Sequence, residues 1–128
     1  MPWFNRNNNK RITVEQVVST LETLSKKNGT LAQTLKYMSS DTSPVADVFR
    51  EYLGLANDCG GILDHCVKEL ELLLVDESGK KQQALLSKID EQCKVLEGHV
   101  GNRTEYDLMK SVQTVKEMQN LVRELGRL

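Results

Sequence analysis

A histidine and a lysine stand three residues apart in the segment Asp64-His65-Cys66-Val67-Lys68. An imidazole exposed to solvent can take a phosphoryl group. A lysine one helical turn further on lies on the same helix face, where its charge offsets that of the phosphate. His65 with Lys68 is therefore a candidate phospho-acceptor pair. The competing interpretation is that both side chains belong to the solvated face of an amphipathic helix.

The His-x-x-Lys spacing resembles the phospho-accepting helix of histidine phosphotransfer domains. Those domains are four-helix bundles that relay a phosphoryl group between response regulators, so the resemblance implies a phosphorelay role for His65. It covers four residues of the chain. Where that family usually has a small residue directly after the lysine, this chain has Glu69, which puts a negative charge where an anionic group must approach.

The three cysteines, Cys59, Cys66 and Cys93, indicate no further chemistry. Their spacing matches no usual pair of close zinc ligands, and none lies in a Cys-x-x-Cys arrangement that lowers a thiol pKa. Cys59 and Cys66 are about 10 Å apart along one helix, which is beyond disulfide reach. The sequence also lacks Glu-x-x-His metal pairs and glycine-rich phosphate loops. We expect three reduced, buried thiols, no metal and no cofactor.

The elements that would position these residues are helices, because apolar residues recur at steps of three and four along most of the chain. A Thr-x-x-Gln capping box at 13–16 predicts a first helix over 14–28, with Gly29 as its C-terminal cap. A second box at 30–33 predicts a short helix over 31–38.

A long third helix is expected from Pro44, at the first helical position, to about Val75. Gly60-Gly61 near its middle predicts a kink or break, since each glycine costs about 1 kcal/mol relative to alanine. A fourth helix is predicted over 80–97. The capping sequence at 102–105 opens a last helix of about 23 residues.

These predictions define an all-α fold, an elongated antiparallel bundle of four to five helices, because short loops force successive long helices to reverse direction. The C-terminal half of the third helix is expected to pair with the fourth and fifth helices, and its N-terminal half with the first two. Residues 13–128 then form a single domain, preceded by a flexible basic arm at residues 1–12.

The third helix carries the longest apolar stripe of the chain, wider than one neighbouring helix can cover. Surplus apolar surface on a bundle without catalytic groups is typical of proteins that bind another protein or themselves. The leading functional hypothesis is therefore a non-enzymatic interaction module, an adaptor or a self-associating subunit. Its candidate contact residues on this helix are Phe49, Tyr52, Leu53 and Leu55.

The arm adds two adjacent aromatic residues, Trp3 and Phe4, among basic residues. This pair can anchor in a groove of a partner or in a membrane interface, or it can fold back onto the bundle. A further alternative is that the basic arm contacts an anionic partner, either nucleic acid or a membrane surface.

Charge and hydropathy limit the partners further. With 17 basic and 18 acidic residues the net charge is -1, so no strong nucleic-acid binding is expected. No apolar run approaches the ~20 residues of a transmembrane helix, and no secretory signal is apparent. We expect a cytoplasmic protein without a transmembrane segment.

Overall fold

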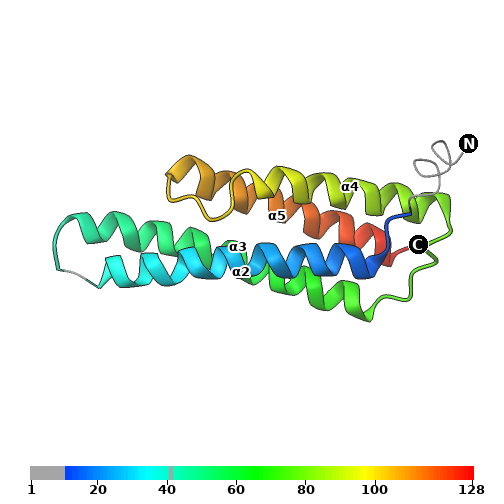
Figure 1. The fold of residues 1–128 in the computed structure, drawn as a ribbon, viewed down its shortest axis with the longest axis horizontal. Helices are drawn as coiled ribbons and strands as arrows, with labels where there is room; N and C mark the ends of the chain where they lie inside the picture. The colour runs from blue at the N-terminus through cyan, green and yellow to red at the C-terminus, as the bar shows by residue number, and fades with distance from the viewer. Residues whose placement is uncertain (1–10, 41) are drawn as a thin grey trace, which may run out of the picture.

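A computed structural model describes residues 11–40 and 42–128, and all regular structure in them is helical (Figure 1). The four helices are α2 (Val14–Ser39), α3 (Val45–Leu72), α4 (Lys80–Glu97) and α5 (Glu105–Gly126). The all-α prediction is confirmed, as is the predicted extent of the 80–97 helix.

The start of α2 is the predicted capping box. The Thr13 hydroxyl accepts a hydrogen bond from the Gln16 backbone N–H at 3.1 Å, and the Gln16 side-chain oxygen accepts one from the Thr13 N–H at 3.1 Å. These bonds satisfy two backbone donors that a helix start otherwise leaves unpaired.

The prediction of two helices over 14–28 and 31–38 is wrong, because α2 runs unbroken through Gly29. The apolar spacing explains this: Leu31 and Leu35 continue the buried face of the preceding turns, and their burial outweighs the cost of one helical glycine, about 1 kcal/mol. The hydroxyl of Thr30 donates to the Lys26 carbonyl oxygen instead of capping a new helix.

The predicted break at Gly60-Gly61 is also wrong, since α3 is continuous from Val45 to Leu72. Gly60 instead permits a close helix approach: a Cβ there would lie 3.0 Å from Nδ2 of Asn28. That buried amide donates to the carbonyl oxygen of Ala56 at 3.0 Å, linking α2 to α3. The helix ends three residues before the predicted Val75, because the chain turns extended at its C-cap.

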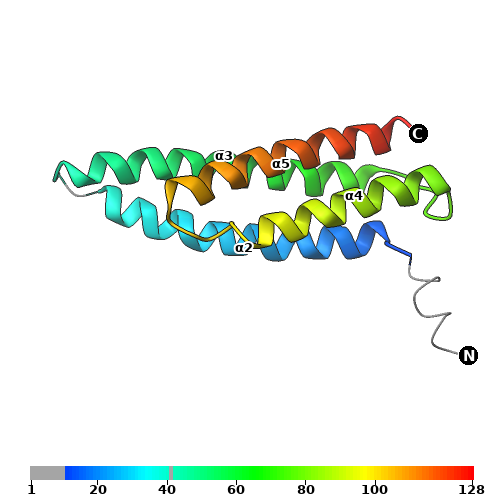
Figure 2. The ribbon, with the colours of Figure 1, turned by 90° about the horizontal axis from the view of Figure 1, so that it is seen from above.

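The helices form two antiparallel hairpins, α2 with α3 and α4 with α5 (Figures 1 and 2). α2 lies beside α4 and α3 beside α5, in each case running in the same direction. The expected pairing of the third helix with the fourth is therefore wrong: α3 and α4 are consecutive but lie diagonally across the bundle. The segment 73–79 crosses one end to join them.

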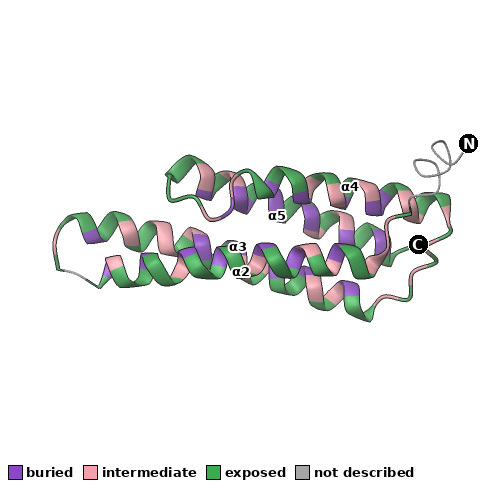
Figure 3. Ribbon diagram, in the orientation of Figure 1, coloured by how far each residue is buried: buried purple, intermediate pink, exposed green. Residues whose placement is uncertain are grey.

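The main core lies where all four helices overlap. It is made of fully buried aliphatic side chains from every helix, together with the three cysteines. Figure 3 shows buried residues along the inner faces of this part, and fewer of them toward the tip of the α2/α3 hairpin.

Candidate interaction surface

The α2/α3 hairpin extends beyond the α4/α5 hairpin at the end where residues 98–104 turn (Figure 1). The helix lengths agree with this, because α3 has 28 residues and α4 has 18, a difference of about 15 Å at 1.5 Å per residue. We call the projecting part, residues 32–39 and 45–55, the overhang. It is a two-helix structure attached to a four-helix one.

The overhang has a small core of its own. Leu35 and Ala46 are fully buried between its two helices. At its base, Leu31 and Ala56 pack in one cluster with Leu108 from the start of α5. The overhang is thus held by packing as well as by backbone hydrogen bonds.

The four contact residues predicted on the third helix lie in this overhang and are half-buried, packed against the cluster at its base. The rings of Phe49 and Tyr52 meet edge to face, with centroids 6.3 Å apart. One side of each residue therefore packs on the hairpin and the other remains accessible.

Three further exposed apolar residues, Tyr37, Val45 and Val48, lie on the overhang and were not among the predicted contact residues. Val45 and Val48 belong to the apolar periodicity of α3, so a sequence signal for them existed. Tyr37 lies outside the buried positions of α2, and nothing in the spacing marks it.

A shallow groove of about 490 Å³ follows the tip of the overhang. Aromatic and aliphatic side chains form most of its wall, and serines from the connecting turn supply hydroxyl groups. A groove of this kind, apolar with a few polar groups at one end, suits the apolar face of a protein segment. Its lining residues are Tyr37, Met38, Ser40, Ser43, Val45, Ala46 and Phe49.

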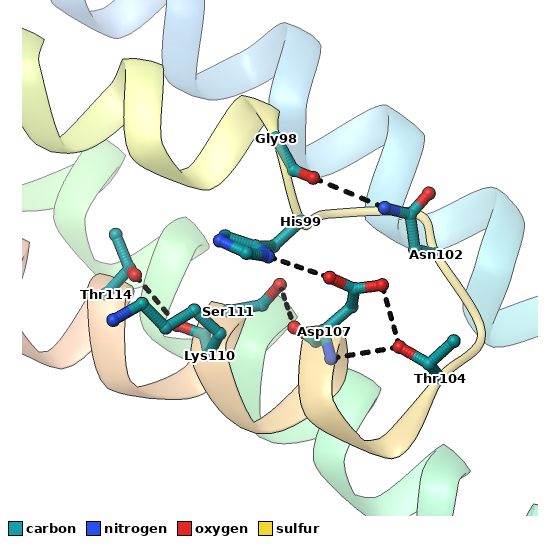
Figure 4. Close-up of polar contacts among 8 residues, drawn as sticks. All are labelled: Gly98, His99, Asn102, Thr104, Asp107, Lys110, Ser111 and Thr114. Atoms are coloured by element: carbon teal, nitrogen blue, oxygen red, sulfur yellow. Dashed lines mark hydrogen bonds and ion pairs between the residues drawn. The ribbon is translucent and has the colours of Figure 1, made fainter.

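The turn between α4 and α5 fixes where the four-helix part stops (Figure 4). Nδ1 of His99 lies 2.7 Å from Oδ1 of Asp107, and the Thr104 hydroxyl donates to Oδ2 of the same carboxylate at 2.7 Å. The Thr104 oxygen also accepts from the Asp107 backbone N–H, which caps α5. The hydrogen bonds from His99 and Thr104 lower the pKa of Asp107. This polar cluster closes the turn.

The same turn contacts α2. Gly101, at φ 86°, has a conformation that suits glycine, and a Cβ there would lie 3.0 Å from the side chain of Lys27. Arg103 donates to the Met38 sulfur at 3.7 Å. The sequence does not predict the pairing of His99 with Asp107, because the two residues lie on opposite sides of a turn whose path the spacing does not reveal.

Both residues of the candidate phospho-acceptor pair lie on α3. His65 is half exposed, and its Nε2 lies 2.6 Å from a carboxylate oxygen of Glu69. Lys68 lies along a different groove between α2 and α3, beside Lys26 and Glu71. The residue that departs from the phosphotransfer pattern is thus the one that occupies the imidazole nitrogen.

The three cysteines are free and buried, as predicted. Burial raises the pKa of Cys59 and Cys93 to about 12 and that of Cys66 to about 11, so all three are protonated thiols at neutral pH. They act as small core residues.

Trp3, Phe4 and most of the predicted arm lie outside the described residues, so the predictions for them stay predictions. Among residues 11–40 and 42–128, no group of three potential ligand side chains gathers to hold a metal ion. In those same ranges, no helix combines the length and apolar character needed to cross a membrane.

No protein-family model matches this chain, and comparison with curated proteins and with solved structures finds no match.

Proposed function

We propose that the protein acts by contact, as a non-enzymatic protein–protein interaction module, either an adaptor or a self-associating subunit. One observation carries the proposal: the apolar stripe of α3 continues beyond the end of the α4/α5 hairpin. Over the overhang α2 packs against this stripe, α5 adds Leu108 to the cluster at the base, and Val45 and Val48 stay exposed. An incompletely covered apolar stripe is the feature by which one helical protein receives a helix of another.

The size of this surface sets the expected strength of binding. An overhang about 15 Å long and two helices wide lies below the area of standard stable interfaces, unless the partner also contacts neighbouring elements. The exposed side chains of Tyr106 and Met109, at the start of α5, offer such an extension. We expect association that depends on concentration rather than a permanent complex.

Absolute mass by light scattering over a concentration series separates the two forms of the proposal. A self-associating subunit gains mass with concentration and loses that gain in Val45→Ser, while an adaptor stays monomeric until its partner is added. Phe49→Ala and Tyr52→Ala are expected to weaken association more than they reduce helicity. If either variant instead unfolds, with a loss of about 3 kcal/mol or more, those side chains are core residues and the proposed surface is wrong.

Phosphoryl transfer to His65 is the second proposal, because its imidazole is half exposed on α3. The Glu69 carboxylate at Nε2 must move before that nitrogen can react. Incubation with a phosphodonor protein should give acid-labile phosphate that is absent in His65→Gln and increased in Glu69→Gly. Equal labelling of the wild-type protein and His65→Gln would exclude this activity.

A further inference from the structure

The end of the molecule opposite the overhang carries a second apolar surface. The segment that joins α3 to α4 leaves the helix extended, so its side chains alternate in direction. Leu73 and Val75 pack against the main core, and a Cβ built on Gly126 would lie 3.2 Å from the Leu73 side chain. Leu72 and Leu74 point outward, with Leu72 82% exposed and Leu74 fully exposed.

The chain enters its first helix directly beside this segment (Figures 1 and 2). The side-chain amide of Gln83 donates to the carbonyl oxygens of Ile12 and Glu77, at 2.9 and 2.7 Å. The Gln83 side-chain oxygen accepts from the Ile12 N–H at 3.1 Å, and the Glu77 carboxylate accepts from the Val14 N–H at 2.7 Å. Residues 1–10 are therefore attached at a point fixed next to the 73–79 segment.

The charges of the two regions are opposite. Residues 71–77 contain Glu71, Asp76 and Glu77 and no basic residue. The last turn of α3 has no basic residue either, so the partial negative charge of its C-terminus has no cation of its own helix beside it. Three basic side chains, Arg6, Lys10 and Arg11, precede α2. Hydrogen bonds from Ser78 lower the pKa of Asp76, and the charge of Arg11 adds to that effect.

The length of chain before Arg11 is sufficient. Trp3 and Arg11 are eight residue steps apart, and a chain spans at most about 3.3–3.6 Å per step, or about 26–29 Å in all. The segment 73–79, with seven residues, is no longer than that even when fully extended. Both adjacent aromatic residues are thus within reach of the exposed leucines.

We propose that residues 1–10 dock on their own chain, with Trp3 and Phe4 covering Leu72 and Leu74 and the basic residues facing Glu71, Asp76 and Glu77. The aromatic pair buries two otherwise exposed leucine side chains, and the charges fix the direction of the segment. The bundle end where α2 begins and α5 ends is then a closed surface, and the overhang at the opposite end stays open.

Trp3 is the single tryptophan of the chain, so its fluorescence tests this contact in the full-length protein. In the wild-type protein we expect emission at a shorter wavelength, and weaker quenching by acrylamide, than in the free peptide 1–11. In Leu74→Gln and Leu72→Gln, whose altered side chains lie outside the bundle core, the wavelength shift should be lost while helicity is unchanged. Met109→Gln, an exposed apolar position on α5, is the matched control and should keep the shift.

Two further measurements test whether the segment docks on its own chain and whether charge contributes to the docking. Dilution should leave the Trp3 emission unchanged, because the contact lies within one chain; a shift that disappears on dilution would mean that the segment docks on a second copy, and would overturn the proposal. Glu71→Gln should weaken the docking, seen as stronger quenching, and added salt should do the same. Emission equal to that of the free peptide in the wild-type protein would also overturn it.

Discussion

The two halves of α3 share one apolar pattern, but its residues are buried in the C-terminal half and partly or fully exposed in the N-terminal half. At successive seven-residue steps, Cys66 and Cys59 are buried beneath the other helices, Tyr52 is half-buried and Val45 is exposed. The residues change from buried to exposed where the α4/α5 hairpin ends, because beyond that point α2 is the helix that packs along α3. The same spacing therefore gives core in one half and accessible surface in the other, and the lengths of the neighbouring helices decide which.

The largest expected contrast is in stability. Leu63→Ala removes a fully buried side chain from the four-helix part and should lower the free energy of unfolding by about 3–5 kcal/mol. Val45→Ala, on the overhang, should change it by less than about 0.5 kcal/mol. Urea denaturation measures both. Similar losses in the two variants would mean that the overhang stripe is covered, and the comparison would fail.

A smaller difference in stability is expected between substitutions of Gly60 and Gly61, near the middle of α3. Nothing lies within 4 Å of a Cβ built on Gly61, so Gly61→Ala should stabilise the protein by up to about 1 kcal/mol through its higher helix propensity. Gly60→Ala should lack that gain, because its Cβ displaces the Asn28 amide from the Ala56 carbonyl. Thermal unfolding of the two variants decides this. An equal gain in stability from Gly60→Ala and Gly61→Ala would show that α2 and α3 do not pack closely at Gly60.

The smallest effect is expected in the pH dependence of stability, at the turn between α4 and α5 that ends the four-helix part. The pKa of Asp107 is held below its ordinary value of 3.8 by its hydrogen bonds to His99 and Thr104. A carboxyl group with a lowered folded-state pKa stabilises the fold above its unfolded-state pKa, and that contribution is lost as pH falls toward the folded-state value. Asp107→Asn should therefore flatten the decline in melting temperature below about pH 4.

The control for that experiment is Asp58→Asn, at an exposed aspartate of α3 outside the turn. It should leave the acid dependence close to that of the wild-type protein. If the two variants show the same pH profile, the His99 and Asp107 contact does not hold the turn.

Local chemistry made much of the fold predictable. Thr13 and Gln16 define the start of α2 through bonds between near neighbours, and the 80–97 helix followed from its spacing alone. The continuation of α2 through Gly29 was not predictable from the low helix propensity of glycine, because the burial of Leu31 and Leu35 outweighs that propensity.

The arrangement of the helices depends on long-range geometry that a single sequence does not show. The diagonal relation of α3 and α4 depends on which side of one hairpin the other packs. The candidate surface was half predictable: Phe49 and Tyr52 follow from the stripe, but their partial exposure depends on where α4 and α5 end. The pairing of His99 with Asp107 depends on the path of the turn between them.

The most direct test of the central claim is photo-crosslinking from one position in each half of the molecule. A photoreactive amino acid replaces Val48 on the overhang, 43% exposed, or Val95 on α4, 40% exposed, so the two probes are equally accessible. We expect crosslinks to a second copy or to another protein from position 48 and none from position 95. Equal crosslinking from both positions, or crosslinks from position 95 alone, would contradict that claim.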